Sequence, residues 1–121
     1  TMTLTAQDLK NALEQQFADM SRPRVLQVSK GFSYSFDPNK PAGERIDAAT
    51  MMLNGALIEP ARDYRVTINN YLALGGDGFI AFKDGRDQLF GKYDDEVLFA
   101  YIKNNSPLTA PARDRITNTA R

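Results

Sequence analysis

The first twenty residues carry apolar side chains at helical spacing. The apolar positions recur every three or four residues, at Leu9, Leu13, Phe17 and Met20. Thr5 stands just before this run and is a good N-cap residue, and Asp8 three positions later completes a weak capping box. We therefore predict a helix over residues 6–20 that ends before Pro23, because proline cannot continue a helix.

Apolar and polar residues alternate along the middle of the chain, a pattern typical of half-buried β-strands. Three runs follow it, at residues 26–36, 45–53 and 64–69. Gly31 interrupts the first run and predicts a bulge there. Asn54-Gly55 follows the second run and predicts a hairpin turn of type I′, with residues 56–58 as the returning strand.

A second helix is predicted towards the end of the chain. Asp94, Asp95 and Glu96 place negative charge where it complements the dipole of a helix N-terminus. The apolar face of this helix consists of Val97, Leu98, Tyr101 and Ile102. Pro107 ends the helix. Residues 109–121 have little apolar content and predict a tail that wraps over the surface or is disordered.

This order of elements predicts one α+β domain over residues 1–108 with a mixed or antiparallel sheet, followed by the tail 109–121. The chain has 121 residues, of which 42% are hydrophobic, so it can form one modest core. Most aromatic side chains are expected in that core, namely Phe17, Phe32, Tyr34, Phe36, Phe82, Phe90, Phe99 and Tyr101.

Charge and composition exclude several kinds of site. Lys and Arg number 15, as do Asp and Glu, so we expect neither nucleic acid nor a membrane as partner. Cys and His do not occur, which excludes disulfides, Cys/His zinc sites and a histidine general base. Five scattered basic residues are interpreted as a solvated surface without a role: Arg22, Arg24, Lys30, Lys40 and Arg45.

A glycine-rich loop is the strongest candidate site. It follows the run at 64–69 and reads NNYLALGGDGF over residues 69–79. Three glycines within four positions let the backbone approach a ligand closely and leave Asp77 unobstructed. A carboxylate that binds hydroxyls, beside the flat ring of Tyr71, suits a ribose with its base. The same residues also fit a loop in which Asp77 only caps its own backbone.

Three segments together resemble the 5′-nucleotidase family. Residues 25–46 read VLQVSKGFSYSFDPNKPAGERI and are similar to the family's LQVS-x-G strand followed by DPxKPxGxR. Residues 69–79 are similar to NFLAxGGDGF. Residues 4–14, LTAQDLKNALE, are similar to the family's L-T-G-x-x-L-K-x-x-L-E, with Ala6 where Gly is usual. The resemblance keeps order and spacing from about residue 3 to about residue 108.

The resemblance implies the C-terminal substrate-binding domain of a bifunctional UDP-sugar hydrolase/5′-nucleotidase-like metallophosphoesterase, with helices packed outside β-sheet layers. In that family a metal-dependent phosphoesterase domain comes first, so this chain is expected to be an N-terminally truncated piece. The catalytic residues and a pair of divalent metal ions are then expected on the preceding domain. This chain is expected to bind no cofactor, to be inactive alone, and to come from a periplasmic or secreted protein.

The resemblance also implies a role for individual residues. Tyr71 matches one of two aromatic rings that sandwich the nucleobase, and Asp77 matches the aspartate that holds the ribose hydroxyls. Gly75 and Gly76 belong to the loop that lets the ligand approach. Val25 stands where the family commonly carries the second ring, so we expect a base clamp that is one-sided.

Two other functions fit the chain. Asn69-Asn70-Tyr71 is similar to a segment of 2′,3′-cyclic nucleotide phosphodiesterases/3′-nucleotidases, although Asp77 and Phe79 favour the 5′-nucleotidase. The chain can also be a binding module without catalysis. Residues 1–5 read as a strand whose partners are absent, so its open edge predicts a homodimer in which this strand or the first helix crosses between chains.

Overall fold

The structure is a computed structural model that describes residues 1–120. Its elements in chain order are β1 (Met2–Thr5), α1 (Ala6–Gln15), β2 (Phe32–Phe36), β3 (Ile46–Leu53), β4 (Ala56–Leu57), β5 (Asp63–Val66), α2 (Asn70–Ala73), the 3₁₀ turns η1 (Gly76–Gly78) and η2 (Ile80–Asp84), α3 (Asp94–Asn105) and β6 (Ile116–Asn118).

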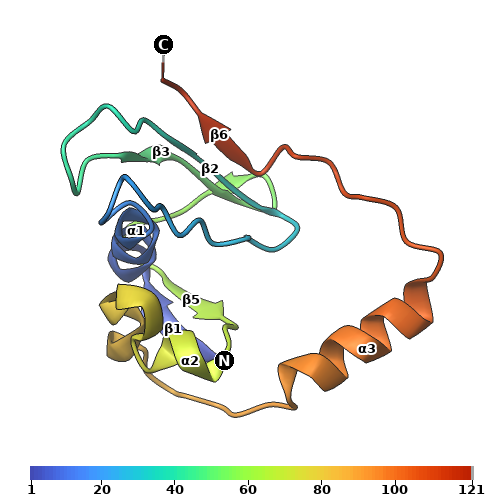
Figure 1. The fold of residues 1–121 in the computed structure, drawn as a ribbon. Helices are drawn as coiled ribbons and strands as arrows, with labels where there is room; N and C mark the ends of the chain where they lie inside the picture. The colour runs from blue at the N-terminus through green and yellow to red at the C-terminus, as the bar shows by residue number, and fades with distance from the viewer. Residues whose placement is uncertain (121) are drawn as a thin grey trace.

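Two sheets lie on either side of α1 (Figure 1). The smaller sheet pairs β1 with β5 antiparallel, with Leu4 opposite Tyr64. The larger sheet has the order β4-β3-β2-β6, in which β6 runs parallel to β2 and the other pairs are antiparallel. This arrangement confirms the predicted α+β fold with mixed and antiparallel sheets.

Helix α1 begins where the sequence predicts and ends earlier. The Thr5 hydroxyl accepts the Asp8 N–H at 3.1 Å, and the Asp8 carboxylate accepts the Thr5 N–H at 2.9 Å, so the capping box is complete. The helix stops at Gln15 rather than at residue 20. Beyond it the Asp19 carboxylate accepts the N–H and the hydroxyl of Ser21, and such local bonds compete with a helical backbone.

Helix α1 contributes side chains to two hydrophobic clusters because a sheet covers it on each side. Ala12 packs towards the smaller sheet, in a cluster with Met2, Leu4, Phe79, Ala81 and Phe82. Leu13 packs towards the larger sheet, in a cluster with Phe17, Tyr34, Ile46 and Met51. Leu9 packs against both clusters. The helix therefore connects the two layers of the core.

The hairpin between β3 and β4 forms as predicted. Asn54 and Gly55 both have positive φ, 52° and 83°, as a type I′ turn requires. The predicted bulge at Gly31 is wrong, because β2 begins only after this residue and the irregular register lies between Ser33 and Ser35. Gly31 instead extends the contact between β2 and β3 by one hydrogen bond, since its carbonyl accepts the Asn54 N–H at 2.7 Å.

Strand β1 has partners within the chain along both edges. Strand β5 covers one edge. On the other edge the Thr3 N–H donates to the Arg86 carbonyl at 2.7 Å, and the Leu89 N–H donates to the Thr1 carbonyl at 2.8 Å. The expected open edge is therefore wrong, and the argument for a homodimer swapped through this strand loses its basis. The helix α1 is likewise packed within its own chain.

Residues 116–118 join the larger sheet. β6 pairs with β2, the Tyr34 N–H donates to the Arg115 carbonyl at 3.0 Å, and the Arg115 guanidinium donates to the Val28 carbonyl at 2.8 Å. The sequence analysis predicted a tail that wraps over the surface or is disordered, since only Ile116 carries a large apolar side chain in this strand. Backbone hydrogen bonds, which leave no trace in an apolar pattern, hold the strand in place.

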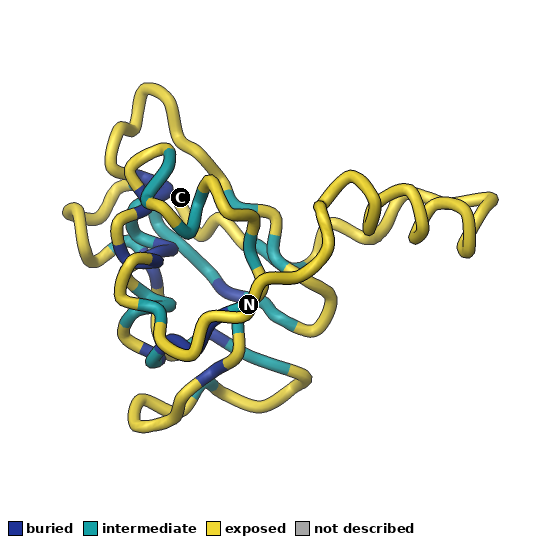
Figure 2. The backbone as a smooth tube through the Cα atoms, turned by 90° about the horizontal axis from the view of Figure 1, so that it is seen from below, coloured by how far each residue is buried: buried dark blue, intermediate teal, exposed yellow. Residues whose placement is uncertain are grey.

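Helix α3 forms within its predicted range but lies away from the rest of the molecule (Figures 1 and 2). All of its residues are exposed. Phe90, Phe99 and Tyr101 are 91%, 70% and 56% exposed, so the prediction that they belong to the core is wrong. The spacing of apolar residues showed that this helix has an apolar face, but it could not show whether another element of the chain reaches that face.

Candidate functional site

The glycine-rich loop forms directly after α2. Asn69 caps this short helix, since its side chain accepts the Leu72 N–H at 2.9 Å. Gly75, Asp77 and Gly78 then adopt positive φ of 84°, 56° and 84°. Glycine takes this conformation without strain and aspartate tolerates it better than most residues, so the loop turns sharply and presents Asp77 at the surface.

At Gly75 and Gly76, other side chains fill the space that a Cβ atom would need. A Cβ on Gly76 would lie within 2.6 Å of the Tyr71 ring, and a Cβ on Gly75 would lie 2.9 Å from the Lys83 side chain. The Tyr71 ring therefore lies against the bare backbone of the loop. It remains 56% exposed, which leaves part of the ring open to a ligand.

Tyr71 and Asp77 form a reciprocal pair. The Tyr71 hydroxyl donates to Asp77 Oδ1 at 3.0 Å, and the same hydroxyl accepts the Asp77 N–H at 3.2 Å. The two residues that the sequence places six positions apart are thus held together at one surface site. The side chain of Asp77 bonds a neighbouring phenol, so the interpretation of Asp77 as a cap of its own loop does not describe this contact.

Arg24 also reaches Asp77, although the sequence analysis assigned it no role. Its Nη1 donates to the Asp77 carbonyl at 2.9 Å, and its Nε lies 3.7 Å from Asp77 Oδ1. Val25, which was predicted to stand in place of a second ring, is the next residue and is 40% exposed. In this segment it is Arg24, and not Val25, that is in hydrogen-bond contact with Asp77. The sequence could have indicated a role for Arg24 only through its position next to Val25.

Buried Gln16 holds the segment that carries Arg24. Gln16 is 1% exposed; its carbonyl accepts the Arg24 N–H at 2.9 Å, and its side-chain oxygen accepts the Leu26 N–H at 2.7 Å. The Tyr34 hydroxyl also donates to this side-chain oxygen, at 3.2 Å. Burial raises the pKa of the Tyr34 phenol, with the Gln16 bond acting in the opposite direction, so the phenol keeps its proton and can donate. Residues 24–26 are therefore pinned from the core.

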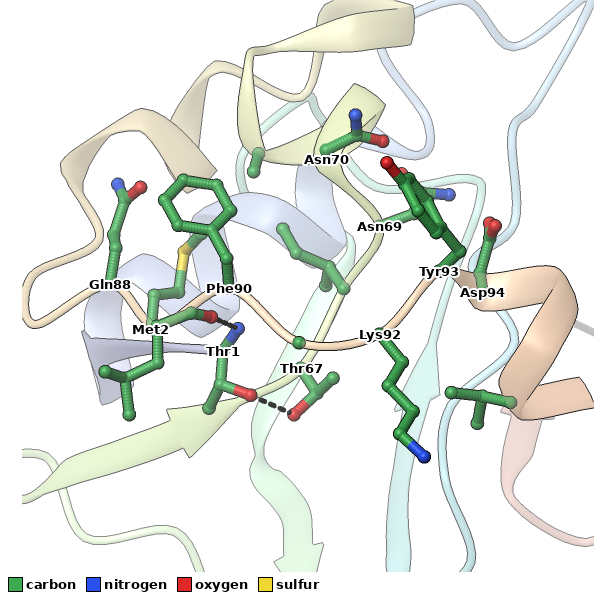
Figure 3. Close-up of a pocket in the computed structure, with 15 residues that line it drawn as sticks. Thr1, Met2, Thr67, Asn69, Asn70, Gln88, Phe90, Lys92, Tyr93 and Asp94 are labelled. Carbon is green, nitrogen blue, oxygen red and sulfur yellow. Dashed lines mark hydrogen bonds between the residues drawn. The ribbon is translucent and has the colours of Figure 1, made fainter.

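A pocket lies beside this site and not at it. Its volume is about 440 Å³, and it opens between the start of β1, the end of β5, the linker after η2 and the first turn of α3 (Figure 3). Asn69 and Asn70 reach it, whereas Tyr71, Asp77 and Arg24 do not line it. Highly exposed Phe90 and Tyr93 form part of its wall. The pocket lies between helix α3 and the β1–β5 sheet. The rings of Phe90 and Tyr93 and the carboxylate of Asp94 line it, but the Tyr71–Asp77 pair does not.

The described residues do not offer a metal centre. Over residues 1–120 no three acidic, histidine or cysteine side chains gather closely enough to hold a metal ion. In the same part of the chain no helix has the length and apolar character to cross a bilayer. The candidate site thus presents one carboxylate, one guanidinium and one aromatic ring, a set suited to holding a flat group and hydroxyls.

Comparison with solved structures places this fold among known ones. A 5′-nucleotidase precursor from Thermus thermophilus matches 97% of this chain with a TM-score of 0.82 and 31% sequence identity. The match covers 24% of that protein. A 5′-nucleotidase from Staphylococcus aureus described as putative has the same fold, with a TM-score of 0.74 at 19% identity.

Comparison of the sequence points in the same direction. An apyrase of Tabanus yao is 33% identical over 99 residues, which are 76% of this chain and 18% of the apyrase. A cell wall protein of Listeria monocytogenes is 31% identical over 102 residues, 84% of this chain and 13% of that protein. The chain thus spans less than a fifth of these two relatives. The model of the family described as "5'-nucleotidase, C-terminal domain" matches residues 1–84. The resemblance of the three motif segments is thereby confirmed, and the chain belongs to the 5′-nucleotidase C-terminal domain family.

Proposed function

We propose that this chain is the substrate-recognition domain of a 5′-nucleotidase, an enzyme that hydrolyses nucleoside 5′-phosphates to nucleoside and phosphate. The observation that carries the proposal is the Tyr71–Asp77 pair, in which the ring and carboxylate are held together over a glycine loop. A nucleobase can stack on the exposed part of the ring. The vicinal hydroxyls of a ribose can donate to the carboxylate in charge-assisted hydrogen bonds.

The chemistry of hydrolysis is assigned to a metallophosphoesterase domain that precedes this one in the longer protein. The residues of this chain do not fit a dinuclear metal site, since the chain has no His and its described acidic residues form no cluster. Metal ions on the other domain would activate water and stabilise the transition state. The residues described above would bind and orient the nucleoside, which places the phosphate for that reaction.

The chain alone is expected to release no phosphate from AMP. The reason is that this chain is proposed to bind and orient the nucleoside only, whereas the metal ions that activate water are assigned to the preceding domain. The measurement is phosphate release by the purified 121-residue chain with Mg²⁺, Mn²⁺ or Zn²⁺ present. Metal-dependent release that co-purifies with the chain and scales with its concentration would contradict the proposal.

The alternative function, that of a 2′,3′-cyclic nucleotide phosphodiesterase/3′-nucleotidase, rests on the segment Asn69-Asn70-Tyr71. Asn69 already has a local role as the cap of α2, so its presence needs no shared substrate to explain it. Asp77 and Phe79 belong to a GGDGF run that resembles the 5′-nucleotidases, and this resemblance favours the 5′-nucleotidase. A non-catalytic binding module would keep the same pair, and the sequence of the preceding domain would separate the two. A periplasmic or secreted location is also part of the proposal, supported by the similarity to a cell wall protein.

Asp77→Ala is the direct test of ribose recognition. The variant is expected to bind adenosine about tenfold more weakly, because charge-assisted hydrogen bonds from the diol are lost. Binding of 2′,3′-dideoxyadenosine, which lacks the diol, should change little. Both dissociation constants can be measured by calorimetric titration of the 121-residue chain. Asp84→Ala is the matched control, since Asp84 is an exposed aspartate on η2. Equal weakening of both nucleosides would exclude a ribose role for Asp77.

A further inference from the structure

Arg24 makes an ion pair that has little value for stability. The side chains of Arg24 and Asp77 are 55% and 45% exposed, and Nε lies 3.7 Å from Oδ1, beyond hydrogen-bond distance. Exposed pairs of this kind contribute about 0–1 kcal/mol. The arrangement nevertheless brings a guanidinium group to the one carboxylate of the candidate site. The hydrogen bond from Nη1 to the Asp77 carbonyl holds the guanidinium in this place. Because the ion pair itself is weak, the chemistry of the two charged groups towards a ligand is the relevant property.

We propose that Arg24 and Asp77 together form the diol-binding site, with Arg24 as a ligand-contacting residue that decides sugar specificity. This inference rests on the proposed nucleoside-binding function and goes beyond it by adding a residue outside the glycine loop. A hydroxyl group both donates and accepts hydrogen bonds. An ionised carboxylate can only accept and a guanidinium can only donate, so the pair satisfies both capacities of a sugar hydroxyl.

The guanidinium of Arg24 retains donors for a ligand. Nη1 is engaged with the Asp77 carbonyl at 2.9 Å, which fixes the orientation of the planar group. The guanidinium carries about five N–H donors in total. The long Nε–Oδ1 distance shows that the carboxylate and the guanidinium are adjacent without a tight bond between them. A hydroxyl that donates to Asp77 would therefore lie within reach of the remaining N–H groups.

The backbone at Arg24 is held rigidly enough for such a role. The Arg24 N–H donates to the carbonyl of buried Gln16, and the Gln16 side chain fixes Leu26 two residues later. Pro23 restricts the chain on the other side. A binding group whose backbone is fixed by buried hydrogen bonds loses less freedom when the ligand arrives. Gln16 thereby acts as a positioning residue for Arg24.

The inference also bears on the expected one-sided base clamp. Val25 supplies no ring, so a base on Tyr71 has no second aromatic neighbour at that position. The adjacent contact is instead polar and directed at Asp77, where the sugar would bind. We therefore expect this protein to discriminate the sugar of a nucleoside more strongly than its base.

The test compares Arg24→Ala and Arg24→Gln with the unchanged chain. Each is titrated with adenosine and with 2′,3′-dideoxyadenosine, and the dissociation constants are measured by calorimetry on the 121-residue chain. Both variants should bind adenosine about tenfold more weakly and bind the dideoxynucleoside almost unchanged. Arg22→Ala, a substitution of another exposed arginine in the same segment, should alter neither constant. Thermal unfolding monitored by circular dichroism verifies that each variant is folded.

The outcomes separate this inference from the proposed function. If Asp77→Ala and Tyr71→Ala weaken adenosine binding while both Arg24 variants bind it like the unchanged chain, the role of Arg24 is refuted and the nucleoside site stands. If the Arg24 variants weaken both nucleosides equally, Arg24 does not read the diol and the inference is also refuted. If the unchanged chain binds neither nucleoside, the proposed function fails and the Arg24 inference fails with it.

Discussion

Phe17→Ala is expected to lower the free energy of unfolding by about 3–5 kcal/mol. Phe17 is 2% exposed and lies in the cluster between α1 and the larger sheet. Its ring stacks on the ring of Phe36 with centroids 4.6 Å apart. Removal of the side chain would leave a cavity in this cluster and end the contact with β2. Urea unfolding followed by far-ultraviolet circular dichroism measures the change.

Phe90→Ala is the matched control for this prediction. It deletes the same side chain at a position that is 91% exposed, and it should change the free energy of unfolding by no more than about 0.5 kcal/mol. The two variants together test whether Phe17 belongs to the core and Phe90, in the segment before α3, lies outside it. The sequence alone could not distinguish these two positions. A comparable loss from the two variants would show that Phe90 packs against protein in solution.

Tyr71→Ala is expected to weaken nucleoside binding by about 1–3 kcal/mol, the range found for stacking of a base on an aromatic ring. The ring lies against the backbone of Gly76 and is 56% exposed, so it is fixed on one side and accessible to a ligand. Calorimetric titration of the 121-residue chain with adenosine would measure the loss. In the proposed full-length 5′-nucleotidase, the same substitution should raise KM for nucleotides, since stacking contributes to binding of the substrate.

Tyr71→Phe separates the ring from its hydroxyl. This variant keeps the stacking surface and removes the hydrogen bond to Asp77 Oδ1. We expect nucleoside affinity at or above that of the unchanged chain, because a sugar hydroxyl then has no phenol to compete with at the carboxylate. A loss as large as that of Tyr71→Ala would show that the hydroxyl, and not the stacked ring, carries the binding.

Caps and turns could be predicted from the sequence wherever residues close together in the chain decide the structure. The capping box of Thr5 and Asp8 formed as predicted, because both partners lie within one helical turn. Asn54-Gly55 formed its turn because these residues adopt positive φ at little cost. The glycine loop placed Tyr71 beside Asp77 for the same reason: a few backbone conformations over six positions determine that contact.

The boundaries of longer elements depended on contacts that the sequence does not display. Helix α1 ends early because Asp19 bonds Ser21 nearby and because Gln16 turns its polar groups towards residues 24–26. Apolar periodicity continues beyond that point, so the pattern alone extended the helix to residue 20. Periodicity reports which positions can be buried, whereas hydrogen bonds to distant backbone decide where a helix stops.

The sequence by itself determined the α+β class, the turn chemistry and the pairing of Tyr71 with Asp77, since each follows from residues close together in the chain. The tertiary structure alone decided three further features. It brought Arg24 to Asp77 across 53 positions, placed β6 beside β2 through backbone hydrogen bonds, and left the apolar side chains of α3 exposed. These features depend on which distant segments meet, and neither composition nor periodicity encodes the distance between two segments once the chain has folded.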